Sequence, residues 1–380
     1  MLNILLLGFT SFFTDIASEM VYPLLPFFLV SSLGASPAIL GLIEGIAESI
    51  ASLLKVFSGY LSDRLGRRKS LTIVGYSASV LGKLLLYLAG GWGMVLAGRS
   101  VDRLGKGIRT APRDALIAES SLSSRRGSSF GLHRAMDTAG AAAGVVIAYL
   151  LLTGSPGNYA GVFLWSLVPA TAGVLILLFV REANAGIHNR AALPALRWRA
   201  LPRKLRMFLL VAIVFSLGNS SNTFLLLRAG SGDVNPARTL LLYLAYTLSF
   251  AVFSYPAGRF SDFVGRKTIL VAGYLLFGLV YAGFAFLSPV GGRWYYWVLF
   301  ILYGVYSAFT EGIEKAFVID LAPGELRATA IGIHATLAGI CLLPASLLAG
   351  QLWSMFGPGA ALGLGAVTGI AAAIALALLV

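Results

Sequence analysis

Residues 59–68 read GYLSDRLGRR, and residues 258–267 read GRFSDFVGRK. The residues repeated in the same order are Gly59/Gly258, Ser62/Ser261, Asp63/Asp262, Gly66/Gly265 and Arg67/Arg266. A second repeat pairs Ala115/Ala316, Glu119/Asp320, Arg126/Arg327, Gly131/Gly332 and His133/His334. Both repeats have an offset of roughly 200 residues in the same direction, which predicts two parallel copies of one structural unit.

The composition around these strings excludes a soluble protein. The chain has 380 residues, of which 58% are hydrophobic and 12% charged, and its mean hydropathy is +0.84. Soluble domains carry about 25% charged residues. A single cysteine, Cys341, excludes a disulfide framework and a cysteine-based metal cluster. The length allows about twelve membrane-spanning helices.

Long apolar runs give the predicted spans and domains. The runs lie near 3–32, 36–61, 70–89, 91–118, 128–153, 159–181, 206–228, 238–258, 267–287, 293–318, 327–349 and 354–380. Helices are the only open structure that satisfies its own backbone in lipid. We therefore predict an all-α membrane protein of 12 transmembrane helices in two parallel six-helix bundles, residues 1–181 and 206–380, with a cytoplasmic linker at 182–205.

Basic residues are concentrated in alternate loops. Arg64, Arg67, Arg68 and Lys69 follow the second run, and the segment 181–206 holds a further series of arginines. By the positive-inside rule, this asymmetry places both termini in the cytoplasm. The net charge of +13 is then mostly a topology signal. The basic loops lack interleaved aromatic residues or a nucleic-acid-binding module, so no nucleic-acid partner is expected.

The first repeat resembles the loop signature that follows the second span in the major facilitator superfamily. It is carried by Gly59, Leu61, Asp63, Arg64, Gly66, Arg67 and Arg68. The resemblance covers the whole chain and implies alternating access, in which two bundles rock about a central cavity. It also implies that Asp63 and Asp262 cap or pair with helix ends and that Arg64 and Arg67 bridge to acidic groups, with Asp114 and Glu119 as candidates. The alternative is that these basic residues only enforce topology.

The fifth span is similar to the glycine-rich span of antiporters in that superfamily. Gly131, Gly140 and Gly144 keep its spacing, although Val145 stands where that pattern has proline. Arg103 departs from the fourth-span pattern, which usually has glycine there. The resemblance to drug/metabolite–proton antiporters of prokaryotes implies an exporter in the cytoplasmic (inner) membrane, crossing it several times.

The fourth span carries an unusual number of charges on one face. At ~100° per residue, its charged residues project within an arc of ~140°, and a charge at the bilayer centre costs at least ~2.5–3.5 kcal/mol. That face is predicted to meet water or other helices. We expect Arg99, Arg103 and the fifth-span Arg134 in a substrate cavity, and Arg109, Arg113 and Asp114 in a cytoplasmic gate. The alternative is a network of salt bridges that ties the fourth span to its neighbours.

Acidic residues inside other spans are the candidates for proton coupling. The candidates are Asp15 and Glu19, one turn apart in the first span, Glu44 and Glu48 in the second, and Asp137 in the fifth. A carboxylate that gains and loses an arginine partner can bind and release a proton. The alternatives are permanent pairing with Lys83, Arg99 or Arg103, and an outer gate formed by Glu44 and Glu48.

The second half contains fewer charges. Asn219 and Asn222 offer hydrogen bonds to a cavity, or act as polar contacts between helices. Glu311 is a further cavity candidate. Glu314–Lys315 aligns with Arg113–Asp114 in inverted charge order, so we assign the pair to the cytoplasmic gate. His133 and His334 are weak candidates for a metal site, since two histidines alone are more often packing residues.

Several classes of function remain. No nucleophile–base set, phosphate-binding loop or cofactor fingerprint is present, so neither an enzyme nor a cofactor is expected. We predict a secondary active transporter, most simply a proton-coupled antiporter that exports a small organic solute and acts as a monomer in the lipid bilayer. The alternatives are a proton- or ion-coupled importer of an organic anion, a divalent-metal exporter, and a membrane receptor or enzyme that does not transport.

Overall fold

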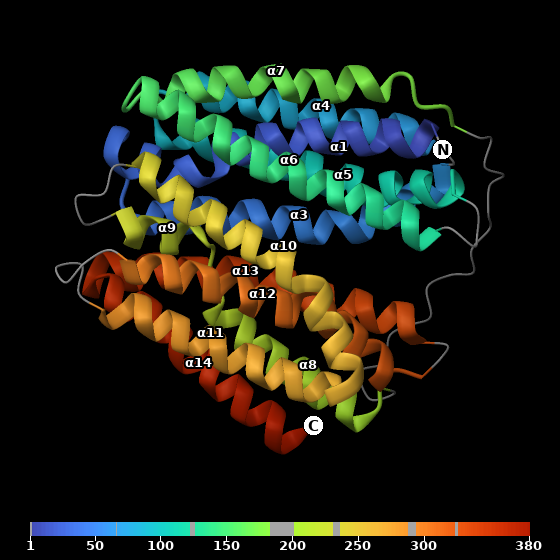
Figure 1. Ribbon diagram of the computed structural model, residues 1–380, viewed down its shortest axis with the longest axis vertical. Helices are drawn as coiled ribbons and strands as arrows, with labels where there is room; N and C mark the ends of the chain where they lie inside the picture. The colour runs from blue at the N-terminus through green and yellow to red at the C-terminus, as the bar shows by residue number, and fades with distance from the viewer. Residues whose placement is uncertain are drawn as a thin grey trace. The chain divides into compact units, whose positions relative to one another are not determined.

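The computed structural model describes residues 2–65, 67–121, 126–182, 201–230, 236–287, 294–323 and 326–380. Side chains at 56, 59–61, 63–65, 126–127 and 328–329 lie outside this description. Nearly all described residues are helical, as the all-α prediction requires (Figure 1). The helices are α1 (Leu2–Val21), α2 (Leu25–Phe27), α3 (Pro37–Leu65), α4 (Arg68–Tyr87), α5 (Trp92–Glu119), α6 (Arg126–Gly154), α7 (Tyr159–Leu177), α8 (Arg203–Gly218), α9 (Thr223–Gly230), α10 (Pro236–Val264), α11 (Arg266–Phe286), α12 (Trp294–Leu321), α13 (Arg327–Phe356) and α14 (Pro358–Leu379).

Most of these helices have the length and composition to cross a membrane. Within the described residues, 11 helical segments meet both conditions. The 28-residue α5 is long enough but is not among them, because its charged residues make it too polar. The prediction of a multi-pass membrane protein therefore agrees with the structure, whereas the number of spans and the cytoplasmic side of the termini stay predictions.

The chain forms two compact units. The first comprises Met1–Ala35, Ile46–Ala191 and Pro236–Leu241, and the second comprises Ser36–Gly45, Ala192–Asn235 and Leu242–Val380. Helix α3 thus contributes its first residues to the second unit and the rest to the first. The domain boundaries at 181 and 206, and the grouping into six-helix bundles, stay predictions.

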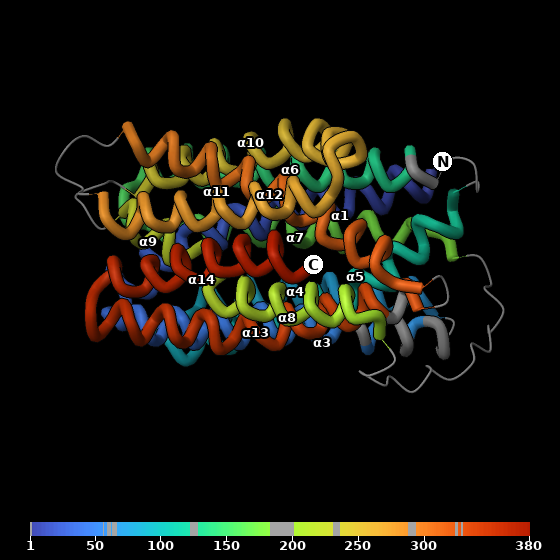
Figure 2. Tube along the Cα trace, turned by 90° about the horizontal axis from the view of Figure 1, so that it is seen from below, coloured from blue at the N-terminus to red at the C-terminus, as the bar shows by residue number. Residues whose placement is uncertain are grey.

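In the first unit, α1 packs against α6 and α7, and α4 packs against α5 and α7 (Figure 1). Apolar side chains of α1, α4, α5 and α7 meet in a buried cluster that includes Leu7, Tyr76, Ile117 and Leu177. In the second unit, α14 lies beside α8, α11 and α13 (Figure 2). An aromatic cluster fills that unit, with the rings of Phe215 and Tyr274 stacked at 4.0 Å.

The first helix of each predicted half is interrupted. Helix α1 ends at Val21 and is followed by a 3-10 turn, the short α2 and a π turn over Phe28–Ser32. Pro23 and Pro26 cannot donate backbone hydrogen bonds, which accounts for the break. Helix α8 ends at Gly218 and α9 begins at Thr223. Breaks of this kind place unpaired backbone groups inside the protein and often mark binding sites in transporters.

The second copy of the repeated loop string forms a turn. Gly265 separates α10 from α11 with φ of 96°, a conformation that favours glycine. Its counterpart Gly66 lies outside the described residues. The duplicated glycine is thus explained, in the copy that the structure describes, by the backbone geometry of this turn.

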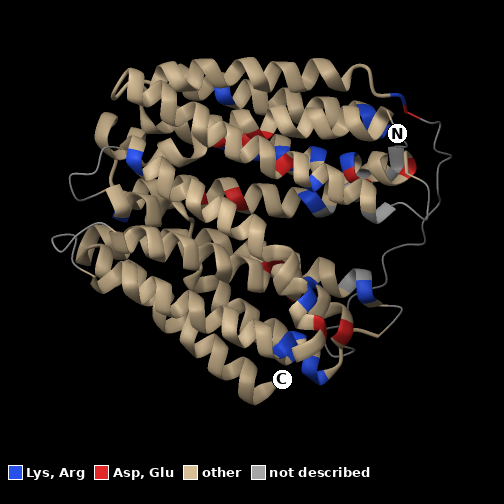
Figure 3. Ribbon diagram, in the orientation of Figure 1, with Lys and Arg blue, Asp and Glu red and all other residues tan. Residues whose placement is uncertain are grey.

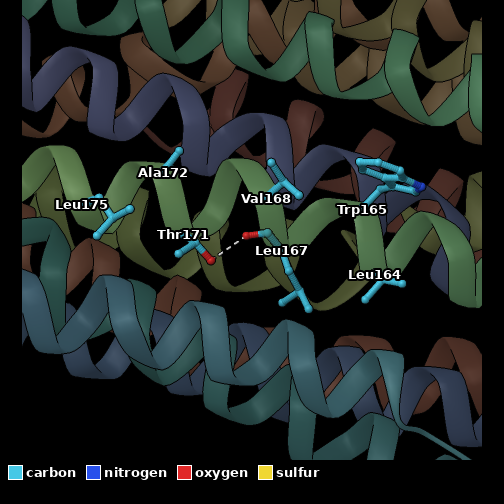
Figure 4. A pocket seen from close by; sticks show the side chains of 7 residues that line it. All are labelled: Leu164, Trp165, Leu167, Val168, Thr171, Ala172 and Leu175. Carbon is cyan, nitrogen blue, oxygen red and sulfur yellow. Dashed lines mark hydrogen bonds between the residues drawn. The ribbon is translucent and has the colours of Figure 1, made fainter.

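The outer surface of the helices is apolar. Helix α7 presents a shallow groove of 540 Å³ lined by its own side chains, among them Leu164, Trp165, Val168 and Leu175 (Figure 4). These side chains are exposed to 44–59%. Exposed apolar side chains on a helix of this length are what a lipid-facing surface requires.

Candidate functional site

Helix α5 carries the charges of the first unit in buried positions. Arg99, Asp102, Arg103 and Arg109 are each less than a tenth exposed, and Figure 3 shows basic and acidic segments within the helices of this unit. The predicted charged face of the fourth span is thus turned toward other helices of the unit. The burial of these four side chains agrees with the prediction that the charged face of this helix does not contact lipid.

Glycines allow α4 and α5 to approach closely enough to bury these charges. A Cβ atom added at Gly82 would lie 2.7 Å from the backbone N of Asp102, and one at Gly75 would lie 2.7 Å from the backbone O of Gly105. Such distances are too short for a side chain, so only glycine fits. The backbones of the two helices therefore pack directly against each other beside the charged side chains.

Asp102 is the centre of a buried ion network. Its carboxylate lies 3.1 Å from the Lys83 ammonium, 3.8 Å from Arg99 Nη1 and 3.3 Å from Arg103 Nε. Glu48 on α3 lies 3.3 Å from Arg103 and 3.8 Å from Arg99. The salt-bridge alternative of the sequence analysis therefore describes these residues: Arg99, Arg103 and Glu48 are all engaged with partners of opposite charge.

Two aromatic rings hold the arginines in place. The Arg99 guanidinium lies 5.4 Å from the ring centre of Tyr22, at the break after α1. The Arg109 guanidinium lies 4.5 Å from the ring centre of Tyr76 and also donates a hydrogen bond to the Ser79 hydroxyl. Both arrangements are cation–π contacts, which stabilise a guanidinium more strongly when water is excluded.

A polar cluster on α1, α4, α5 and α6 is centred on Ser11. The Ser11 hydroxyl is hydrogen-bonded to Tyr76 at 3.1 Å, to His133 Nε2 at 2.8 Å and to Arg113 Nη1 at 3.2 Å. The other ring nitrogen of His133 faces Asp137 at 3.5 Å. The predicted gate residue Arg113 therefore belongs to this cluster. Its neighbour Asp114, also a predicted gate residue, pairs with the Arg113 guanidinium at 2.8 Å.

Asp15 and Asp137 lie near each other among basic side chains. Asp15 is half-buried and interacts electrostatically with Lys106, Arg109, Arg113 and Arg134. Asp137 interacts with Asp15, and with Arg113 and Arg134. Glu19 lies one turn farther along α1 and is also half-buried. Asp15 of the first predicted span is thus brought together with Arg134 and Asp137 of the fifth in one unit.

The repeated loop string is only partly described. Gly66 lies outside the described residues, and for Gly59, Asp63 and Arg64 the structure describes only the helical backbone. Arg67 is exposed and precedes α4 without capping it. Glu119, one of the two candidate acidic partners, pairs with Arg68. Glu182 accepts backbone hydrogen bonds from Arg68 and Lys69 at 2.5 and 3.1 Å, which anchors the start of α4.

In the second unit, polar residues line the break between α8 and α9. Asn219 donates a hydrogen bond to the Tyr306 hydroxyl at 3.2 Å, and Asn222 accepts one from Tyr303 at 2.7 Å. Ser221 donates to Glu44 at 3.2 Å, and both residues belong to the second unit. Asn219 and Asn222 are half-buried.

Near the start of α13, the second unit has a polar cluster of its own. Glu314 accepts a hydrogen bond from the Tyr274 hydroxyl at 3.0 Å and lies 3.5 Å from His334 Nε2. Its neighbours Glu311 and Lys315 are exposed. Also in the second unit, Arg266 at the start of α11 pairs with Asp320 at 2.6 Å and with Asp262 at 3.4 Å. Asp262 therefore pairs with the first residue of α11.

No group of three or more histidine, cysteine or carboxylate side chains that could hold a metal ion occurs among the described residues. His133 contacts a serine and an aspartate, and His334 contacts a glutamate and stacks on Phe208 at 5.8 Å. The two histidines thus take part in separate polar clusters.

Sequence reasoning missed the tyrosines of these clusters. Tyr76 and Tyr274 each follow a glycine, Gly75 and Gly273, and each hydroxyl contacts the polar cluster of its own unit. The signal was present as a repeated Gly-Tyr pair after the loop string. It was hidden because the second copy is one residue shorter between Arg266 and Tyr274 than the first between Arg67 and Tyr76.

An all-helical chain with membrane-length helices, interrupted first helices and buried charges has the features of a polytopic membrane transporter. The family model for the Major Facilitator Superfamily matches residues 7–340 and, in a second match, 231–380. The chain therefore belongs to the Major Facilitator Superfamily, a family of transporters and not of enzymes.

Individual relatives agree with this assignment. An uncharacterised MFS-type transporter of the archaeon Methanocaldococcus jannaschii is 38% identical over 359 residues, which is 93% of this chain and 89% of that protein. Multidrug resistance protein MdtH of Cronobacter sakazakii is 24% identical over 324 residues, 82% of this chain and 77% of that protein. The crystal structure of nucleoside transporter NupG has a TM-score of 0.83 at 13% identity and covers 99% of this chain and 98% of that one. At this identity the structural likeness shows the fold alone.

Proposed function

We propose that this chain is a proton-coupled exporter of a small organic solute that works by alternating access. Membership of a transporter family supports the carrier mechanism, and the relative named a multidrug resistance protein supports export. The two predicted bundles, 1–181 and 206–380, rock about the substrate while 182–205 links them on the cytoplasmic side. The protein acts as a monomer in the inner membrane of a prokaryote.

The observation that carries the proposal is the placement of Asp15 and Asp137. The two carboxylates lie near each other inside a unit that crosses the membrane, in the field of Arg113 and Arg134. Intramembrane carboxylates of this kind are costly to maintain and typically serve ion pathways. A carboxylate is ionised while arginine faces it and takes up a proton when the arginine withdraws. We assign the proton to this pair.

The charged residues of α5 favour export of a solute over import of an organic anion. Arg99 and Arg103 are paired with Asp102 and Glu48, so their charges are already balanced in part. The half-buried Asn219 and Asn222 offer neutral hydrogen-bonding groups in the second unit. These groups suit a solute with polar substituents on an organic skeleton.

The direct test uses purified protein in liposomes loaded with the pH dye pyranine. Small organic cations, anions and neutral compounds, beginning with ethidium, are added outside. Exchange of solute for protons should make the lumen alkaline as the solute enters, whereas symport would make it acidic. Counterflow of labelled solute with no pH change would identify a carrier without proton coupling, and no flux with any compound would contradict the proposal.

Asp15→Asn and Asp137→Asn test the residues. Each variant should lose at least about tenfold of the uptake driven by a pH gradient, because the removed carboxylate can no longer exchange a proton. Each should keep solute counterflow, which needs no net proton movement. Asp320→Asn is the matched control, since Asp320 is half-exposed and paired with Arg266 outside this cluster. Full gradient-driven uptake by both variants would refute the assignment.

A further inference from the structure

The two units contain related polar clusters built on equivalent positions. In the first unit, Tyr76 of α4, His133 of α6 and Arg113 of α5 each form a hydrogen bond with the Ser11 hydroxyl. In the second unit, Tyr274 of α11 and His334 of α13 meet at one carboxylate, that of Glu314 on α12. The tyrosines and the histidines are pairs in the internal repeat.

The two clusters differ in charge at the position of Arg113. Arg113 and Glu314 occupy equivalent places in the repeat that aligns His133 with His334. An arginine stays charged at any physiological pH, whereas a glutamate can bind and release a proton. At this position the first unit therefore holds a fixed positive charge, and the second holds a group able to change its charge.

The surroundings of Glu314 differ from those of Glu48 and Asp102. Glu48 and Asp102 are paired with arginines or lysine, whereas Glu314 lies 3.5 Å from a histidine ring, as Asp137 does in the first unit. The groups around it are the Tyr274 hydroxyl of α11 and the imidazole of His334 on α13, with Glu311 and Lys315 on its own helix. From α8, the ring of Phe208 stacks on His334 and shields it.

Burial completes this environment. The side chain of Glu314 is 17% exposed and that of His334 is 10% exposed, while Tyr274 is fully buried. Glu311 and Lys315 are exposed to the surroundings. The carboxylate is thus mostly buried between a fully buried tyrosine and a second titratable ring.

We propose that Glu314 is a second proton-binding site of this carrier, held in position by Tyr274 and His334, and that the cluster around Arg113 is its fixed-charge counterpart. The inference rests on the proposed function, since it adds a second coupled proton to that of Asp15 and Asp137. Glu314 binds the proton, and Tyr274 and His334 are positioning residues.

The proton step at Glu314 is a simple transfer. A proton from water adds to a carboxylate oxygen, which forms an O–H bond and removes the negative charge. Release breaks that bond and passes the proton to water or to the neutral His334 ring at 3.5 Å. Tyr274 keeps its own proton and donates a hydrogen bond to the other carboxylate oxygen, so it fixes the orientation of the group in both states.

The first test needs no substrate. Infrared difference spectra of the purified full-length protein in lipid are recorded between acidic and alkaline buffer. Protonated carboxyl groups give a C=O band that separates from the carboxylate bands. The difference spectrum of Glu314→Gln should lack one such band, and that of Tyr274→Phe should keep the band at a shifted frequency, because its hydrogen-bond donor is gone. Glu311→Gln is the matched control, since Glu311 lies on the same helix but is exposed. Its difference spectrum should keep the carboxyl band that Glu314→Gln loses.

The second test measures protons moved per solute. With a solute that passes the pyranine assay, Glu314→Gln should move one proton fewer per solute than the native chain, while Asp137→Asn removes coupling by a different site. An unchanged carboxyl spectrum in Glu314→Gln, with native far-ultraviolet circular dichroism, would overturn the inference. So would an unchanged proton-to-solute ratio. Absence of solute-driven proton flux in the native chain would instead contradict the proposed function, and the infrared result would still decide whether Glu314 binds a proton.

Discussion

Replacement of Asp102 by asparagine should strongly destabilise the first unit. The carboxylate is 7% exposed and lies within 3.8 Å of Lys83, Arg99 and Arg103. Asparagine keeps the size of the side chain and removes its charge. Arg99 and Arg103 would keep their contacts with Glu48. Lys83 would lose its ion pair and keep its hydrogen bond to the Ser18 hydroxyl at 3.2 Å.

The expected magnitude follows from this imbalance. Removing one partner of a buried ion pair costs about 3–5 kcal/mol, because the remaining charge is left uncompensated. At about 1.4 kcal/mol per factor of ten, the unfolding equilibrium constant should rise by about two to four orders of magnitude. Lys83→Met should cost less, since Asp102 keeps both arginines. In Lys83→Met/Asp102→Asn the two losses should not add, because the cation that Asp102 neutralised is gone as well.

The measurement is unfolding of purified protein in mixed detergent micelles with increasing dodecyl sulfate, followed by tryptophan fluorescence. Native, single and double variants are compared at one detergent concentration. Equal losses for the two single variants, or a double variant whose loss equals their sum to within about 0.5 kcal/mol, would refute the network as the source of stability. The charged residues of α5 would then be neutralised mainly by water or lipid.

Two further variants test other contacts. Gly75→Leu should lower the yield of folded protein in detergent, as measured by size-exclusion chromatography, because its Cβ would lie 2.6 Å from the Cβ of Arg109. Gly131→Leu is the control and should fold normally, since no atom lies within 4 Å of a Cβ at that position. Equal yields would disprove the close packing of α4 and α5. Glu119→Arg should lower the transport rate by no more than about fivefold, because partly exposed ion pairs contribute about 0.2–1 kcal/mol. The double variant Arg68→Glu/Glu119→Arg, which exchanges the two charges, should restore that rate. A double variant that fails to restore it would show that topology alone explains Arg68.

The sequence was informative where one physical constraint dominated. Apolar runs long enough for a bilayer predicted the helices, because no other open backbone structure is stable in lipid. The charged face of α5 was predicted to avoid lipid for the same reason, and it packs against glycines of α4. The break after α1, which ends at Val21, is accounted for by Pro23 and Pro26, whose backbone nitrogens cannot donate hydrogen bonds.

The partners of each charge could not be predicted in the same way. Long side chains such as Arg99 and Arg103 reach several neighbours, and the choice between Glu48, Asp102 and water depends on helix rotation by a fraction of a turn. One residue turns a helix by about 100°, so the sequence alone could not select Arg68 among its basic neighbours as the partner of Glu119.

The comparison of the two copies also explains why a duplicated chain can use its halves differently. Each unit keeps a tyrosine, a histidine and a polar centre, so the framework of the cluster was preserved after duplication. At one position an arginine, which holds a constant charge, corresponds to a glutamate, which can lose its charge. If both copies held arginine, the second cluster would have no carboxylate at this place to bind a coupling proton. If both held glutamate, the first unit would have one cation fewer near Asp15 and Asp137. The difference between Arg113 and Glu314 is therefore the substitution we expect in a carrier whose second unit adds a proton-binding carboxylate to the pair Asp15 and Asp137 of the first.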